Sequence, residues 1–201
     1  MKKKMKICVC VIIIVMVSYL YAHIDKNNMI YDKNIADNEY QTTGNIIEGS
    51  LVQTFVCQED KLDGIRIKTI KNGDLSNVTI NYIITDLETK KEYSGSVVGN
   101  DIKNNKYYKF EIGQQLVGCK GKSFQIEISE EGSSDYNGVS FYMTPTQAEQ
   151  TTLSLNNYDQ DKTVIMKTVT HRFDMETFVM MIVSICFVCG FMKILYYLFN
   201  K

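Results

Sequence analysis

The central part of the chain, residues 62–128, alternates between apolar and polar positions with a period of two. Phe124, Ile126 and Ile128, for example, are each separated by one polar residue. Because successive side chains of a strand point to opposite faces, this pattern predicts strands with one buried and one solvent-facing side. Such strands are typical of antiparallel sheets, whereas strands of parallel α/β sheets are continuous apolar runs.

The pattern predicts strands at residues 51–56, 62–70, 78–85, 92–98, 107–112, 124–128 and 138–143. Asn72-Gly73 and Gly99-Asn100 supply turn residues between them. Beyond Pro145, the single proline, residues 151–155 and 162–169 are expected to pair as a returning hairpin. The expected fold class is mainly β, an antiparallel β-sandwich of the jelly-roll kind.

An apolar run at residues 7–22 follows a basic tail at residues 1–6. As a helix the run is ~24 Å long, slightly short of the ~30 Å hydrocarbon core of a bilayer. A cleaved signal peptide ending at Ala22 is one interpretation. We favour an uncleaved anchor, because Leu20 is too large for a cleavage motif and Tyr19 suits the membrane interface.

A second apolar run, residues 177–199, contains one charged residue, Lys193. Near the inner interface a lysine can extend its ammonium group to water. The sequence therefore predicts two transmembrane helices, which flank a linker at residues 23–49 and a β-domain at residues 50–172. Residues 200–201 are expected to be cytoplasmic, like the basic tail.

Charge is strongly segregated along the chain. All 23 acidic residues lie between His23 and Glu176. The ends contain no acid and six lysines, namely Lys2, Lys3, Lys4, Lys6, Lys193 and Lys201. Because cytoplasmic flanks are enriched in lysine, this predicts a hairpin in the cell membrane, with both termini cytoplasmic and the β-domain outside. An acidic domain repels phosphates, so nucleic acid is not an expected partner.

Only Cys57 and Cys119 of the six cysteines lie outside the apolar runs. In an exported domain they are a candidate disulfide, and two buried free thiols are the alternative. Cys186 and Cys189 match a CxxC spacing but lie in an apolar helix, which lacks the ligands and solvent access of a metal or redox site. Cys186 and Gly190 instead form a small-xxx-small pair, which predicts close packing against the first span or a partner helix.

Residues 24–170, which include nearly the whole β-domain, contain no histidine, since His23 and His171 adjoin the apolar runs. A Ser-His-Asp site and a His-ligated zinc site within the domain are therefore excluded. Carboxylates remain as candidates for glycan hydrolysis or for calcium binding. Those considered are Asp60, Asp63, Asp86, Asp101, Asp135 and the pair Glu130-Glu131. Because most fall in expected loops, where acids are ordinary, no catalytic residue and no metal ligand is assigned, and no cofactor is expected beyond calcium.

Exposed aromatic rings are the usual platform for sugar rings. Candidate stacking residues are Tyr93, Tyr107, Tyr136 and Tyr142. Strand parity places Tyr107 and Tyr142 opposite the core positions, and the other two lie near strand ends. Tryptophan is absent, so the alternative is that these tyrosines cover the edges of the sandwich.

Four segments occur in an order that resembles a known group of domains: residues 62–67, 82–86, 104–110 and 121–128. Together they are similar to the galactose-binding-like, jelly-roll extracytoplasmic domains of Gram-positive envelope membrane proteins. The resemblance covers about residues 51–172 and carries no catalytic signature. It implies a domain displayed outside the membrane, in a group that includes proteins linked with surface polysaccharide.

The sequence thus favours a non-enzymatic, membrane-anchored binding protein of the bacterial cell envelope. Its expected partners are membrane lipid and an envelope glycan or another membrane protein. Two alternatives remain open: an enzyme that acts on cell-wall glycan through carboxylates, and a small accessory subunit of a polysaccharide-related membrane complex.

Overall fold

The computed structural model describes residues 2–200, without the side chains of residues 2–4, 6 and 7. The terminal residues of the two predicted cytoplasmic ends, Met1 and Lys201, lie outside the described residues. The chain divides into two compact units, residues 27–170 and residues 1–26 with 171–201.

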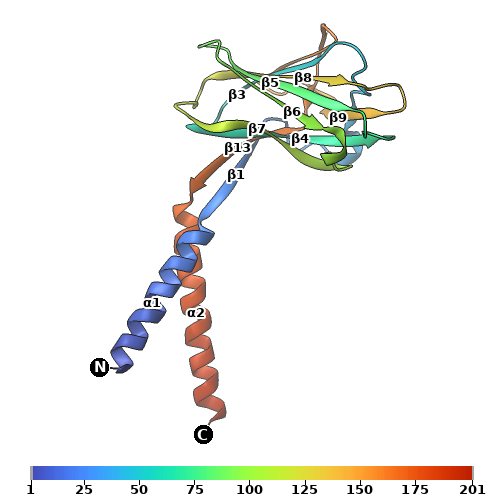
Figure 1. Cartoon of the computed structure of the whole chain (residues 1–201). Coiled ribbons are helices and arrows are strands. Elements are labelled where there is room, and N and C mark those ends of the chain that lie inside the picture. Colours follow the sequence, from blue (N-terminus) through green and yellow to red (C-terminus); the bar gives the residue numbers. More distant parts are fainter. Residues whose placement is uncertain (1, 201) are drawn as a thin grey trace. The chain divides into compact units, whose positions relative to one another are not determined.

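The larger unit is a sandwich of two β-sheets (Figure 1). The first sheet contains β1 (His23–Met29), β2 (Gln41–Thr42), β4 (Lys61–Asn72), β7 (Lys106–Val117), β9 (Gly138–Thr144), β12 (Thr163–Val164) and β13 (Met166–Phe173). The second contains β3 (Leu51–Val56), β5 (Thr79–Asp86), β6 (Glu92–Val98), β8 (Ser123–Glu131), β10 (Thr152–Leu155) and β11 (Tyr158–Gln160). Residues 23–26 of β1 and 171–173 of β13 belong to the smaller unit.

The long strand β4 is the centre of the first sheet. The sheet runs β1-β13-β4-β9-β12, with β7 also paired to β4 and β2 paired to β9. The second sheet runs β11-β10-β3-β8-β5-β6. The strand pairs with a defined register are antiparallel, for example β4 with β7 and β5 with β8. The expected antiparallel β-sandwich is therefore confirmed, and its jelly-roll character stays a prediction.

The core lies between the sheets and contains the residues that the alternation assigned to it. Phe124, Ile126 and Ile128 are all buried, and polar neighbours take the other face of β8. Phe55 of β3 stacks on Phe124 with ring centroids 6.0 Å apart. Burial of such side chains stabilises the fold by roughly 1.5–3 kcal/mol each.

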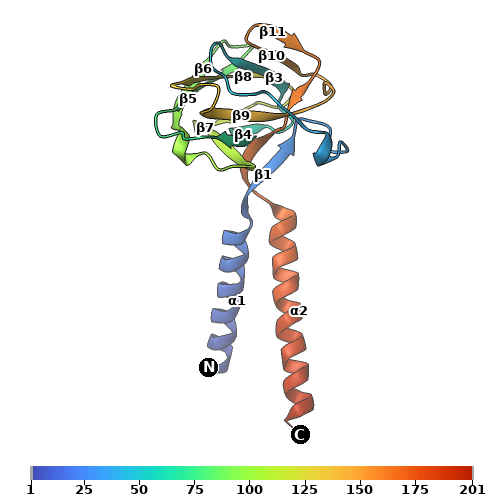
Figure 2. The same cartoon turned by 90° about the vertical axis from the view of Figure 1, so that its right-hand side faces the viewer.

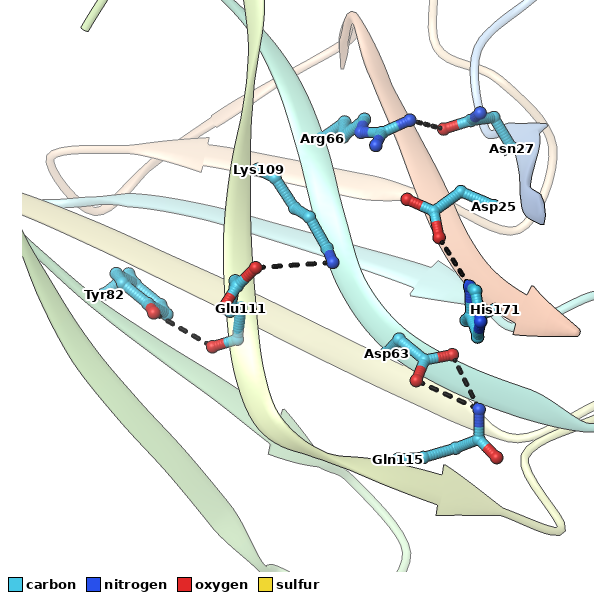
Figure 3. A network of polar contacts seen from close by, with 9 residues as sticks. All are labelled: Asp25, Asn27, Asp63, Arg66, Tyr82, Lys109, Glu111, Gln115 and His171. Carbon is cyan, nitrogen blue, oxygen red and sulfur yellow. Dashed lines mark hydrogen bonds and ion pairs between the residues drawn. The ribbon is translucent and has the colours of Figure 1, made fainter. Parts of the chain in front are cut away.

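One tyrosine connects the two sheets through the core. Tyr82 of β5 donates a hydrogen bond from its hydroxyl to the backbone oxygen of Glu111 in β7, at 2.9 Å (Figure 3). Its ring meets Phe110 edge-on, with centroids 5.1 Å apart. Gly95 of β6 is the register partner of Tyr82, and a Cβ atom there would lie 2.3 Å from the tyrosine hydroxyl oxygen. Glycine at this position leaves room for the ring.

The returning hairpin differs from the prediction. β10 pairs with the short strand β11 through Asn156 and Asn157, both of which have positive φ angles, 52° and 66°. Consecutive residues with positive φ form the tight turns that suit two-residue hairpins, and asparagine tolerates them well. The hairpin therefore closes early, and the chain crosses to the first sheet, where β12 pairs with β9 and β13 with β4.

The segment expected to be a linker, residues 23–49, also differs from the prediction. It supplies β1 and β2, together with the 3-10 turn η1 (Asp37–Glu39). Ile30 and Ile46 are buried in the core, so part of this polar segment packs on the sandwich. A second 3-10 turn, η2 (Gly99–Asp101), follows β6.

The smaller unit contains the helices α1 (Lys2–Tyr21) and α2 (Met175–Phe199), which lie side by side (Figures 1 and 2). Asp174 caps α2 by accepting a hydrogen bond from the Thr177 N–H at 3.1 Å. Beside the helices, His171 Nδ1 and Asp25 Oδ1 are 3.0 Å apart.

Of the two helices, α2 alone is long and apolar enough to cross a membrane by length and composition, within residues 2–200. The apolar part of α1, Cys8–Tyr21, is shorter. The second of the two predicted spans is thus supported as a candidate, and the first stays a prediction.

We expect Gly95→Ala to lower the free energy of unfolding by about 1–3 kcal/mol, because the added methyl group collides with the Tyr82 ring. Denaturant unfolding of the full chain in detergent measures the effect. Ser96→Ala, at an exposed position of the same strand, serves as the control and should change stability little. A Gly95→Ala protein as stable as the parent would contradict the close approach of β6 to Tyr82.

Candidate functional site

A row of three cations crosses the first sheet. Arg66 of β4 is the register partner of Lys109 in β7 on one side and of Lys167 in β13 on the other. Its neighbours Ile65 and Ile67 are fully buried, so the row lies on the outer face of the sheet. Directly opposed like charges are destabilising in a sheet. A row of three positively charged residues on three adjacent strands is therefore unusual in a domain rich in acidic residues.

Tyrosines extend this row along the same face. Lys68, two residues after Arg66 on β4, is the register partner of Tyr107. We call the whole surface the tyrosine–cation face; it comprises Tyr31, Tyr40, Tyr107, Tyr142, Arg66, Lys68, Lys109 and Lys167. All eight side chains are half-buried. They come from five different regions of the chain, which the fold brings together.

Two of the three lysine ammonium groups of this face lie over tyrosine rings. Lys167 Nζ is 4.1 Å from the ring centroid of Tyr107. Lys68 Nζ is 4.8 Å from that of Tyr142 and 5.0 Å from that of Tyr40. Contacts of this kind stabilise a cation by roughly 0.5–2 kcal/mol. They therefore hold the lysines in place without neutralising their charge.

Hydrogen bonds fix two further members of the face. The hydroxyl groups of Tyr31 and Tyr107 are 2.9 Å apart. Arg66 Nη1 donates a hydrogen bond to Asn27 Oδ1 at 2.7 Å, as Figure 3 shows. Lys109 Nζ lies 3.4 Å from Glu111 Oε1 on the same strand.

Burial shifts the pKa of several groups on the face. It raises the pKa of Tyr107, to which the hydrogen bond with Tyr31 adds. Burial likewise raises the pKa of Tyr40, helped by its hydrogen bond with Asp37. The pKa of Lys167 is lowered, first by burial and then by the positive charges of Arg66 and Lys68. The two tyrosines thus stay neutral at ordinary pH.

A shallow pocket of about 410 Å³ opens in this face. Its lining residues are Asn27, Arg66, Tyr107, Lys109 and Lys167. The pocket thus contains the complete cation row and one aromatic ring. Such a lining can bind a negatively charged group through charge-assisted hydrogen bonds, and it contains no carboxylate that could act as a catalytic acid or base.

The four tyrosines expected to stack on sugars lie in three places. Tyr107 and Tyr142 share the tyrosine–cation face, as strand parity predicted. Tyr93 packs against the core, with Lys91 Nζ 5.2 Å from its ring centroid. Tyr136, in the loop between β8 and β9, is 83% exposed. Their role in stacking stays a prediction, and the two on the face have lysines over their rings.

Two of the candidate acids, Asp86 and Asp63, have local structural partners. The Asp86 carboxylate accepts hydrogen bonds from the N–H groups of Glu88 and Thr89 and so shapes the turn after β5. Asp63 accepts two hydrogen bonds from Gln115 Nε2, at 3.0 and 3.1 Å. Asp63 and Glu111 line one shallow pocket of about 210 Å³. Within residues 2–200, no group of three or more His, Cys, Asp or Glu residues could hold a metal ion, and calcium stays a prediction.

Most of the candidate acids were expected to lie in loops, but Glu130 lies in a strand. It occupies a core-facing position of β8 and is 8% exposed. Its Oε2 atom accepts a hydrogen bond from the Val139 N–H at 3.1 Å. Its Oε1 atom has no hydrogen-bond partner among the described residues. Burial raises the pKa of this carboxyl to about 7.

Cys57 and Cys119 are both buried and are free thiols in this structure. Cys57 lies in the connection between β3 and β4, and Cys119 in that between β7 and β8. The two connections are neighbours, because the Cys57 N–H bonds to the Lys122 oxygen at 2.9 Å and the Lys122 N–H bonds to the Cys119 oxygen at 3.0 Å. Burial raises the pKa of the Cys57 thiol to about 11. The disulfide stays a prediction, and both alternatives remain compatible with this neighbourhood.

Cys186 and Gly190 both lie on exposed positions of α2. A Cβ atom added to Gly190 would meet nothing within 4 Å. Among the described residues, therefore, no close helix packing occurs at this glycine. Packing against a partner helix stays a prediction.

Sequence reasoning missed Tyr31 and Tyr40 because they fall in the segment expected to be a linker. Arg66 and Lys68 had a signal, since both alternate with core isoleucines and must face outward. Lys167 could not be placed, because the predicted hairpin paired its segment with the wrong strand. The cation row depends on the observed pairing of β13 with β4.

No protein-family model and no curated protein sequence matches the chain. Solved structures do match. A clostridial cysteine protease, Cwp84, after propeptide cleavage, is 10% identical with a TM-score of 0.42, over 68% of this chain and 41% of that chain. The xylan-binding module CBM15 is 8% identical with a TM-score of 0.33, over 76% of this chain and 99% of the module.

A second structure of Cwp84, a surface layer associated protein of Clostridium difficile, contains its cysteine protease and lectin-like domains. It is 11% identical with a TM-score of 0.35, over 68% of this chain and 36% of that chain. The chain thus spans about two fifths of the length of the two Cwp84 structures. Because these TM-scores are below 0.5, no property of these proteins is transferred to this chain.

We expect the stability of the protein to fall as the pH rises from 5 to 8, on account of Glu130. The folded state raises the pKa of this carboxyl from 4.5 to about 7, so the folded state binds the proton more tightly than the unfolded state. The contribution of the Glu130 carboxyl to stability is complete at pH values below its pKa in the unfolded state and is lost as the pH rises through 7. The free energy of unfolding falls over this range by an amount on the order of 2–3 kcal/mol.

Thermal unfolding of the parent and of Glu130→Gln at several pH values isolates this contribution from that of other groups. The difference in melting temperature between the two proteins should grow with pH, in favour of the variant. Glu131→Gln, at the exposed next position, is the control. Parallel pH profiles for parent and Glu130→Gln would refute the assignment.

We expect Cys57 and Cys119 to resist thiol reagents in the folded protein, because both are buried and thiolate is the reactive form. The measurement uses a variant whose other four cysteines are replaced by serine. Unfolding in denaturant without reductant should release two reactive thiols if the pair is free, and none if a disulfide is present. Rapid labelling of the folded variant would contradict the burial.

Proposed function

We propose that this chain is a membrane-anchored, non-enzymatic binding protein of the bacterial cell envelope, and that its β-sandwich binds a glycan on the tyrosine–cation face. The observation that carries the proposal is the assembly of four tyrosines and four cations on one outer sheet surface. No requirement of the core explains it, since the core residues of the same strands point the other way. Aromatic rings and charged hydrogen-bond donors are the groups that sugar-binding surfaces combine.

Binding is favoured over catalysis by the chemistry of the pocket in this face. Glycoside hydrolysis requires two carboxyl groups on either side of the bond that is cleaved. The pocket lined by Arg66, Lys109 and Lys167 contains none. In the neighbouring shallow pocket, Glu111 pairs with Lys109 and Asp63 with Gln115, so both carboxylates already have side-chain partners.

The cell membrane is the proposed location. α2 has the length and composition of a membrane span, and the ends of the chain contain six lysines and no acid. Under the positive-inside rule both ends face the cytoplasm and the acidic β-sandwich faces outward. Membrane lipid around the helices is then an obligatory partner.

A protein partner is the second candidate, in the form of a larger membrane complex to which this chain is an accessory. The open space around Gly190 supports it, because a small-xxx-small pair allows a second helix to approach closely. This role would use α2 and is compatible with glycan binding by the sandwich.

We expect the full chain, purified in detergent, to bind at least one member of a panel of immobilised envelope polysaccharides, neutral and acidic. Tyr142→Ala should weaken that binding about tenfold, because it removes a ring from the centre of the face. Biolayer interferometry measures the affinity, and the melting temperature confirms that the variant is folded.

Tyr158→Ala is the matched control, since Tyr158 is 75% exposed on β11 in the other sheet. Its affinity should equal that of the parent. Absence of binding to every polysaccharide would refute the glycan function. Pull-down from membranes of a partner whose capture requires Gly190 would then favour the accessory role.

A further inference from the structure

We propose that the ligand of the tyrosine–cation face is an acidic glycan, whose carboxylate or phosphate group sits in the pocket between Arg66, Lys109 and Lys167. This inference rests on the proposed glycan-binding function and names the chemical class of the ligand.

The register places the three positive charges side by side. Arg66 faces Lys109 across one strand interface and Lys167 across the other. Neighbouring strands are ~4.8 Å apart, so the row is about 10 Å wide at the backbone. Opposed like charges in a sheet cost free energy, and an anion in the row removes that cost.

The acids of the domain leave at least one cation of the row, Lys167, without a carboxylate beside it. Lys109 has Glu111 at 3.4 Å, and Lys68 has Asp37 at 3.9 Å, where the Asp37 side chain is largely exposed. Within residues 2–200, no carboxylate lies within ion-pair distance of the Lys167 ammonium, whose neighbour is the Tyr107 ring. Burial lowers the pKa of Lys167, and the positive charges of Arg66 and Lys68 lower it further. The row therefore keeps an excess of positive charge.

The aromatic rings organise these charges in advance of binding. Tyr107 lies under the Lys167 ammonium and is itself tied to Tyr31. A lysine that is already ordered loses less conformational entropy when an anion binds, which favours affinity. Arginine adds the planar fork of N–H groups that matches a carboxylate or phosphate. The site thus has the parts of a preformed anion pocket.

A glycan fits the surroundings of the pocket better than other polyanions. The face continues beyond the pocket through Tyr40 and Tyr142, whose rings and hydroxyl groups suit the apolar faces and hydroxyls of sugars. A row of cations spread over three strands suits the repeated charges of a polymer.

The test compares a neutral polymer with two acidic ones, one a carboxylate and the other a phosphate. The full chain is placed in nanodiscs of zwitterionic lipid, and its affinity is measured for polygalacturonate, for fully methyl-esterified polygalacturonate and for poly(glycerol phosphate). We expect at least one of the two polyanions to bind ten times more tightly than the ester, or better. That binding should weaken as salt is raised from about 0.05 to 0.5 M, because salt screens exposed charges.

Variants connect the effect to the pocket. Arg66→Gln with Lys167→Gln should lower affinity for the polyanion at least tenfold. Lys103→Gln with Lys120→Gln removes the same charge from exposed positions elsewhere and should retain at least a third of the affinity. Lys167→Gln alone should raise the melting temperature at low salt, because it relieves repulsion within the row.

The outcomes separate the two proposals. Equal affinity for polygalacturonate and its ester, or equal loss in both double variants, would overturn the acidic ligand and leave glycan binding intact. Failure of every polysaccharide, here and in the wider panel, would overturn both. Binding to vesicles that contain phosphatidylglycerol, without binding to either polyanion, would overturn the glycan and identify an anionic lipid surface instead.

Discussion

The pairing of β4 on both of its edges is the constraint on which the rest of the structure depends. A strand has two faces and two edges, and β4 uses all four. Its inner face supplies buried isoleucines to the core, and its edges pair with β7 on one side and with β13 and β9 on the other. A one-residue slip of any of these pairs would exchange core and surface residues. The same register that buries Ile65 and Ile67 also brings Lys109 and Lys167 to Arg66.

This coupling explains why an unfavourable arrangement of charges can persist. Burial of the apolar residues of β4, β7 and β13 fixes the register with a free energy far larger than the repulsion between exposed or half-buried lysines. The core thus tolerates the cation row, and the tyrosines beneath the lysines reduce its cost further. Stability and recognition are divided between the two faces of one sheet.

Much of the sandwich could be predicted from the sequence, because alternation along one strand is a local signal. Phe124, Ile126 and Ile128 needed no knowledge of their partners to be assigned to the core. The pairing of one strand with another is not given by such a local signal. Asn156 and Asn157 adopt positive φ and close a hairpin earlier than the β-branched run suggested, which moves β13 to the other sheet. The site depends on that long-range choice, so Arg66, Tyr107 and Tyr142 were visible singly and their assembly was not.

The cation above Tyr107 has an optical consequence. The chain has 13 tyrosines and no tryptophan, so tyrosine emission is not lost by energy transfer to an indole. A ligand that draws the Lys167 ammonium away from the ring, or disturbs the hydroxyl contact with Tyr31, changes the electrostatic environment of that chromophore. The protein thus contains an intrinsic spectroscopic reporter at the centre of the surface where we place its ligand, and occupancy can be followed in solution without a label.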